Sequence, residues 1–87
     1  MIVMAPVYFT WLPKAGSVDE IRLDQCKQVL SRLVAGRPGS AFLDFMRDTP
    51  VTRDPTNFMD VAHYRAGVAM LIEGEIAKAL ATARAAR

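Results

Sequence analysis

Residues 2–9, Ile-Val-Met-Ala-Pro-Val-Tyr-Phe, form a continuous apolar run without a charged side chain. Because β-branched and aromatic residues follow one another with no polar alternation, a strand built from them needs burial on both faces. This pattern is typical of an interior strand in a parallel sheet that helices cover on both sides. Pro6 has no amide hydrogen to donate, so we expect a bulge or the end of the strand there.

A helix is predicted after this strand, over residues 18–35. The stretch 17–20, Ser-Val-Asp-Glu, fits the capping-box pattern S-x-x-E, in which each side chain satisfies a free amide of the other residue. Gly36 and Pro38 are the signals that end the helix. Apolar side chains recur at helical spacing and form one stripe, which consists of Val18, Ile21, Cys26, Val29, Leu30, Leu33 and Val34.

The second half of the chain repeats this order. Residues 41–46, Ala-Phe-Leu-Asp-Phe-Met, predict a second strand, parallel to the first because a helix intervenes, with a right-handed crossover. Residues 47–59 predict a long irregular loop, and loops of this length in compact domains are often functional. The last helix is predicted over about 61–85 from a stripe of Tyr64, Val68, Leu71, Ile72, Ile76, Ala79, Leu80 and Ala83.

The predicted order β-α-β-α contains too few strands for a stable sheet. The first strand is apolar on both sides, and its edges would be unpaired in a monomer. We therefore expect residues 1–87 to be a single partial domain. Its missing neighbours come either from residues absent from this sequence or from a second copy of the chain.

Composition and charge argue against several classes of protein. A formal charge of +2, from 11 basic and 9 acidic side chains, forms no basic stripe with interleaved aromatics, so we expect no nucleic-acid binding. One histidine and one cysteine far apart in sequence make no metal site, and no glycine-rich phosphate loop is present, so no cofactor is expected. The single Cys26 excludes an internal disulfide, and we expect it to be a small buried hydrophobe rather than a reactive thiol.

The sequence also bears on membranes and export. No apolar run approaches the roughly 18 residues that a membrane span needs, so none is expected. The first six residues lack the basic region of a signal peptide, and Pro6 breaks their apolar run. The compartment stays open, and would be periplasmic or otherwise extracytoplasmic if a parent protein is exported.

Asp60 and His63 are the candidate catalytic residues. Their spacing of three would place both side chains on one side of the first turn of the last helix, beyond the carboxyl ends of the strands, where open α/β sheets form their sites. A carboxylate beside an imidazole can orient it, fix its tautomer and stabilise the imidazolium that forms during proton transfer. The alternative is that Asp60 is only a helix N-cap and His63 a partly exposed residue of the first turn.

The stretch 54–65, Asp-Pro-Thr-Asn-Phe-Met-Asp-Val-Ala-His-Tyr-Arg, resembles the last motif block of SGNH (GDSL) hydrolases. In that family an Asp-x-x-His follows the final strand and opens the last helix. The predicted strands and helices of this chain arrive in the family's order. The resemblance covers essentially the whole chain, but only the C-terminal part of such a domain. It is closest to the bacterial branch linked to surface polysaccharides and their acyl groups. It implies a flavodoxin-like three-layer sandwich with parallel strands, of which this chain is a β-α-β-α fragment.

The resemblance implies that His63 is the general base and that Asp60 orients it, in a Ser-His-Asp type of ester hydrolysis or acyl transfer, with an acylated carbohydrate as the implied substrate. The family's Gly-Asp-Ser nucleophile block and its oxyanion blocks are absent, and Ser17, Ser31 and Ser40 do not fit the role of nucleophile. We therefore expect the chain to be inactive alone. The alternative function is a small non-catalytic α/β interaction module that oligomerises through its apolar strand.

Three further residues have two interpretations each. Tyr8 and Trp11 are candidates to line a sugar subsite, with core or lid packing as the alternative. Arg65 is a candidate to meet an anionic substrate, with an ion pair to Asp60 or Asp54 as the alternative.

Overall fold

The computed structural model describes residues 1–85, which form a mixed α/β arrangement of two long helices, one short helix and two small sheets. The long helices are α1, Val18–Ala35, and α3, Ala66–Ala85, and the short one is α2, Pro50–Arg53. Strands β1, Ile2–Met4, and β2, Phe42–Asp44, form one sheet. Strands β3, Phe58–Asp60, and β4, His63–Tyr64, form the other. Single 3-10 turns occur at Phe9–Trp11 and Pro55–Asn57.

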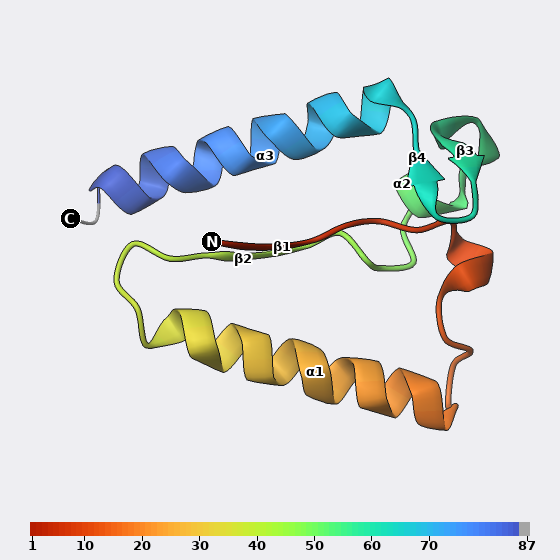
Figure 1. Ribbon diagram of the computed structural model, residues 1–87, viewed down its shortest axis with the longest axis horizontal. Coiled ribbons are helices and arrows are strands. Elements are labelled where there is room, and N and C mark those ends of the chain that lie inside the picture. The colour runs from red at the N-terminus through yellow and green to blue at the C-terminus, as the bar shows by residue number, and fades with distance from the viewer. Residues whose placement is uncertain (86–87) are drawn as a thin grey trace.

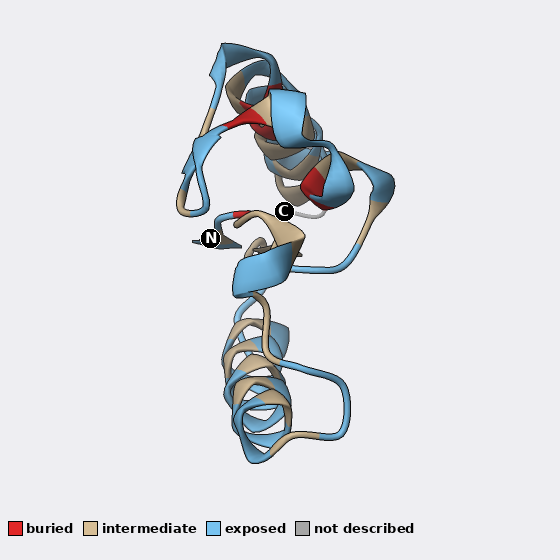
Figure 2. Cartoon of the chain, turned by 90° about the vertical axis from the view of Figure 1, so that its right-hand side faces the viewer, coloured by how far each residue is buried: buried red, intermediate tan, exposed pale blue. Residues whose placement is uncertain are grey.

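The elements stack in three layers. Figure 1 shows the β1–β2 pair between α1 on one side and α3 on the other, and Figure 2 shows the same order from the end of the helices. The molecule measures 39 × 31 × 16 Å, so it is a flat slab whose sheet is only two strands wide.

The predicted parallel pairing is confirmed. Ile2 pairs with Phe42, Val3 with Leu43 and Met4 with Asp44. Both strands are shorter than the predicted 2–9 and 41–46, because the chain leaves the ladder before Pro6 and after Asp44. Beyond Pro6 it forms the 3-10 turn at Phe9–Trp11 instead of extending the strand.

The start of α1 matches the prediction, with one difference in its cap. The Ser17 hydroxyl accepts a hydrogen bond from the Glu20 amide at 3.1 Å. The Glu20 carboxylate accepts from the amide of Gly16 at 3.1 Å, and not from Ser17. The Ser17 amide donates to the Lys14 carbonyl instead, so the reciprocal bond of the capping box moves back by one residue.

The predicted last helix is wrong at its beginning, because α3 starts at Ala66 and not near residue 61. Residues 58–64 form the β3–β4 hairpin, which contains an irregularity in register between Phe58 and Asp60. The Arg65 amide donates to the Asn57 carbonyl at 2.8 Å and closes the hairpin. The predicted irregular loop 47–59 also contains α2, whose N-cap Thr49 exchanges hydrogen bonds with Thr52.

The core is small and lies in one layer. Phe58, Val68 and Ile72 are its buried hydrophobic side chains, and the buried Thr52 donates its hydroxyl hydrogen to the Arg47 carbonyl. Figure 2 shows buried residues around α3 and the hairpin, whereas α1 has none. Several large hydrophobic side chains of the predicted α1 stripe are exposed, namely Val18, Ile21, Val29 and Leu33. No helix within residues 1–85 combines the length and apolarity that crossing a bilayer requires.

Candidate functional site

The β3–β4 hairpin brings Asp60 and His63 together. Asp60 ends β3, His63 begins β4, and the two residues are partners in the antiparallel ladder. The Asp60 carboxylate accepts a hydrogen bond from the Ala62 amide at 2.9 Å, which forms an Asx turn between the strands. The Asx turn gives the Ala62 amide a hydrogen-bond acceptor that does not depend on a helix. The local sequence therefore supports a hairpin where the start of a helix was predicted.

The two side chains form a bonded acid–imidazole pair. Nδ1 of His63 lies 2.7 Å from Oδ1 and 2.9 Å from Oδ2 of Asp60. Because an ionised carboxylate can only accept, Nδ1 carries the hydrogen that it donates. The neutral imidazole then has its free electron pair on Nε2, and no other residue of the described chain bonds to this ring. The side chains of His63 and Asp60 are 71% and 59% exposed, so a second molecule can reach Nε2.

The surroundings keep Asp60 ionised. The Ala62 amide, followed by the hydrogen bond from His63, lowers the pKa of the Asp60 carboxyl below its ordinary value of 3.8, against a smaller opposing effect of desolvation. A carboxylate that stays charged at neutral pH can hold the imidazole in one tautomer and stabilise its protonated form.

Non-local contacts fix the hairpin at the end of the parallel strands. The Tyr8 amide donates to the Val61 carbonyl at 2.9 Å, which joins the turn of the hairpin to the segment that follows β1. The ring of Tyr8 lies 5.6 Å from the ring of the buried Phe58. Figure 1 shows the hairpin beyond the carboxyl ends of β1 and β2, the edge at which the candidate site was expected.

The structure places the other candidate residues differently. One of the two interpretations of Arg65, the ion pair with Asp60 or Asp54, is wrong, because its guanidinium donates to the Phe58 carbonyl at 3.1 Å and so holds β3 in place. Asp54 accepts from Thr56 instead. Tyr8 is half-buried in aromatic contacts, and Trp11 lies exposed in the 3-10 turn.

The structure also shows where Cys26 and the three serines lie. Cys26 is exposed, so its predicted burial is wrong. The Ser17 hydroxyl is engaged at the N-terminus of α1, Ser31 lies within α1, and Ser40 precedes β2 at the amino end of the strand. None of the three follows the carboxyl end of a strand.

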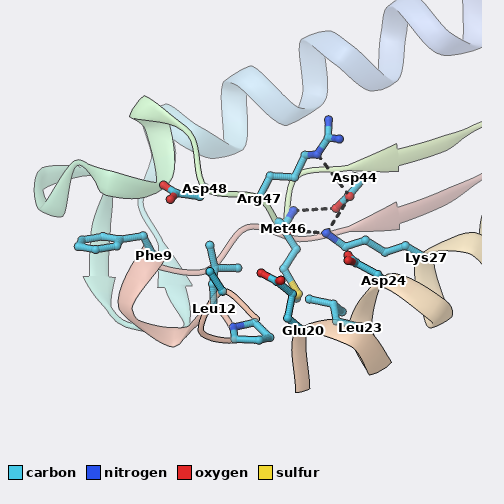
Figure 3. A pocket seen from close by; sticks show the side chains of 12 residues that line it. Phe9, Leu12, Glu20, Leu23, Asp24, Lys27, Asp44, Met46, Arg47 and Asp48 are labelled. Atoms are coloured by element: carbon cyan, nitrogen blue, oxygen red, sulfur yellow. Dashed lines mark hydrogen bonds and ion pairs between the residues drawn. The ribbon is translucent and has the colours of Figure 1, made fainter. Parts of the chain in front are cut away.

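A second polar cluster, which the sequence did not predict, lies where β2 ends. Nζ of Lys27 lies 2.9 Å from Oδ2 of Asp44 and donates to the Met46 carbonyl at 2.6 Å. Nε of Arg47 lies 3.7 Å from the same carboxylate oxygen. Figure 3 shows this cluster on the wall of a hollow of about 320 Å³ between α1 and the loops. The carboxylate within the otherwise apolar strand sequence was the signal that could have revealed it.

This cluster is a structural clip between α1 and β2. Lys27 and Asp44 are mostly buried, and each has partners within the cluster. Buried charges that are paired in this way are typical of packing rather than of a binding site.

A smaller hollow adjoins the acid–imidazole pair. Its volume is about 190 Å³, and Tyr8, Phe58, Met59 and Asp60 are among its lining residues. Among residues 1–85, no group of three or more histidine, cysteine or carboxylate side chains is placed to hold a metal ion.

No protein-family model, curated protein or solved structure matches this chain.

Proposed function

We propose that the chain is the acid–base segment of a serine-type ester hydrolase or acyltransferase related to the SGNH hydrolases. The observation that supports this most is the bond from Nδ1 of His63 to Asp60, which leaves Nε2 free at the carboxyl edge of a parallel strand pair. The arrangement of two helical layers around these strands agrees with a part of a flavodoxin-like sandwich.

In this proposal His63 moves the protons of acyl transfer. Its Nε2 takes the proton of a serine hydroxyl as the oxygen attacks the ester carbonyl, and the carboxylate of Asp60 stabilises the imidazolium. The imidazolium then gives the proton to the leaving alcohol. In the second half of the reaction Nε2 takes a proton from water, or from an acceptor alcohol, and returns it to the serine oxygen.

The serine and the oxyanion donors belong to residues outside 1–87. Residues 1–87 alone then supply no nucleophile, and we expect them to hydrolyse no ester through a covalent acyl intermediate.

The proposed substrate is an acylated carbohydrate. The hollow beside Asp60 has room for a short acyl group, and the 3-10 turn that contains the exposed Trp11 lies at the same end of the molecule as the hairpin (Figure 1). Apolar and aromatic surfaces with a few polar groups are what small-ligand sites typically provide.

The test begins with the DNA upstream of codon 1, translated in frame. We expect a Gly-Asp-Ser after an apolar strand, and hydrolysis of p-nitrophenyl acetate by the longer polypeptide. His63→Ala and Asp60→Asn should each lower kcat at least about 100-fold, as for the loss of an acid–base group. Asp54→Asn, in the same loop and without a bond to His63, is the matched control and should retain activity. An upstream frame without a serine block, or full activity in His63→Ala, would refute the proposal.

A second candidate, a non-catalytic interaction module, is favoured by the exposed apolar residues Val3, Val29 and Leu33. The two functions separate cleanly, because substitution of His63 would leave self-association of such a module unchanged.

A further inference from the structure

The two flanks of α1 differ in polarity. On the side of β2, Asp24, Gln28 and Ser31 of α1 line a hollow together with Phe42 and Asp44 of the strand. These polar side chains suit a surface that faces water.

The opposite flank of α1 has a line of exposed apolar side chains from Cys26 to Leu33, with Arg22 at its N-terminal end. At 100° per residue, Cys26, Val29 and Leu33 lie roughly half a turn around the helix from Asp24, Gln28 and Ser31. The half-buried Leu23, Leu30 and Val34 lie between the two flanks and face the sheet. Cys26, Val29 and Leu33 therefore lie on the side of the free edge of β1. Val29 is 61% and Leu33 49% exposed, and Cys26 is exposed as well.

The free edge of β1 lies beside this flank of α1. The side chain of Val3 points to the other face of the sheet, because Ile2 and Met4 pair with Phe42 and Asp44, which face α1. The Ile2 amide donates to Ala41 and the Met4 carbonyl accepts from Phe45, so the polar groups of both residues face β2. Those of Val3 alternate to the other edge, where β1 has no partner strand among residues 1–85. Residues 1–9 carry no charged side chain, and the side chain of Val3 is 40% exposed. Such an edge lacks the charges that usually prevent pairing with another chain.

The exposed area of the slab is large enough for a stable interface. The chain exposes 6185 Å², whereas a compact monomer of its mass exposes about 5,100 Å². The excess of roughly 1,100 Å² exceeds the approximately 800 Å² that each partner buries in a standard interface.

We propose that a second copy of this chain covers the free edge of β1 at Val3 together with the flank of α1 formed by Cys26, Val29 and Leu33. The two β1 strands pair antiparallel across a two-fold axis at Val3. Each Val3 amide donates to the carbonyl of Val3 of the partner subunit, which completes a four-stranded sheet in the order β2-β1-β1-β2. A single edge that is unpaired and uncharged is complementary to itself under this symmetry.

The same axis places the two α1 helices side by side and antiparallel on one face of the sheet. Cys26 lies at the middle of α1, so the two copies of this residue meet near the axis. The Asp60–His63 pairs lie at opposite ends of the joint sheet and stay exposed. Asp60 and His63 lie outside the interface, so His63→Ala should leave the dimer unchanged. This variant separates a failure of the interface from a failure of the proposed esterase function.

Sedimentation equilibrium of the 87-residue chain tests the interface. The expected mass is twice 9.6 kDa at micromolar concentration. Val29→Glu and Val3→Lys should each raise the dimer dissociation constant at least tenfold. Gln28→Glu places the same side chain one residue away on the polar flank and should leave the dimer unchanged. Circular dichroism checks that each variant folds. If Val3→Lys does not fold, the result for Val29→Glu alone decides the test.

A cross-linking experiment tests the geometry. A short bismaleimide should join the chains covalently through Cys26, whereas Gln28→Cys in a Cys26→Ser background should not cross-link. A monomeric chain, a dimer that ignores Val29→Glu, or equal cross-linking at positions 26 and 28 would overturn the proposal. A chain that stays monomeric but binds a strand of a longer polypeptide or of another protein would identify a different occupant of this surface. That result would also overturn the proposal.

Discussion

Replacing Phe58 by alanine should cost much of the stability of the molecule. Phe58 is one of its few buried hydrophobic side chains, and its ring lies 5.6 Å from the ring of Tyr8 at the hairpin. Phenylalanine-to-alanine changes in protein cores cost about 3–5 kcal/mol. This core is shallow, so water and neighbouring side chains can partly fill the space, and we expect about 3 kcal/mol. A chain of this length has a total stability of about 4–13 kcal/mol, so the loss is a large share.

Urea denaturation followed by circular dichroism measures this loss, at one fixed protein concentration because association would add to the apparent stability. The neighbouring Met59→Ala is the matched control. Met59 lies on the same strand but is exposed, so its replacement should change the free energy of unfolding by no more than about 0.5 kcal/mol. A loss below about 1 kcal/mol for Phe58→Ala, or equal losses for the two variants, would refute the assignment of Phe58 to the core.

Three further predictions concern the clip, the acid–imidazole pair and the helix cap. Asp44→Ala should lower the free energy of unfolding by about 2 kcal/mol, because it leaves the mostly buried Lys27 without its carboxylate. The double variant Lys27→Met with Asp44→Leu should recover most of that loss. Urea denaturation that shows no recovery in the double variant would contradict this explanation. The pKa of Asp60 is lowered, so the charged carboxylate stabilises the hairpin fully above pH 3.8, and this stabilisation is lost as the pH falls through the lower pKa of the folded state. Carbon NMR of the Asp60 carboxyl should show a titration midpoint below 3.8, and Ala62→Pro should raise that midpoint. A midpoint at or above 3.8 in the unaltered chain would be the contrary result. Ser17→Ala should cost about 1 kcal/mol through loss of the bond to the Glu20 amide, whereas Ser31→Ala within the same helix should be nearly neutral in the same denaturation assay.

The parts of the fold that local signals determine were predictable. The cap at Ser17 and the stop at Gly36 predicted a helix over 18–35, and α1 has these bounds. The apolar strands predicted a parallel pair, which the ladder between β1 and β2 confirms.

The hairpin was not predictable because its sequence fits two structures. A separation of three residues places Asp60 and His63 together either in the first turn of a helix or across a tight hairpin. The contacts that favour the hairpin come from Tyr8, distant in sequence, and from the bond between Arg65 and Asn57 across its ends. The pair itself was predictable from its residue types and their spacing, because both structures bring the carboxylate to the imidazole.

The strand lengths and the exposure of Cys26 differ from the prediction for another physical reason. An apolar pattern in the sequence indicates which side chains favour burial, but whether they are buried depends on which other elements pack against them. With one partner strand, β1 keeps three residues in its ladder, and the flank of α1 that contains Cys26 and Val29 faces no neighbour within residues 1–85.

The tautomer of His63 tests the central claim about the site most directly. Long-range proton–nitrogen NMR at about pH 9, well above the ordinary range of an imidazole, shows which ring nitrogen carries the hydrogen. The bond to Asp60 predicts a hydrogen on Nδ1 and a bare Nε2, the reverse of the preference of an isolated side chain. Asp60→Ala should restore the usual tautomer. A hydrogen on Nε2 in the unaltered chain would contradict the claim that this pair is arranged for proton transfer.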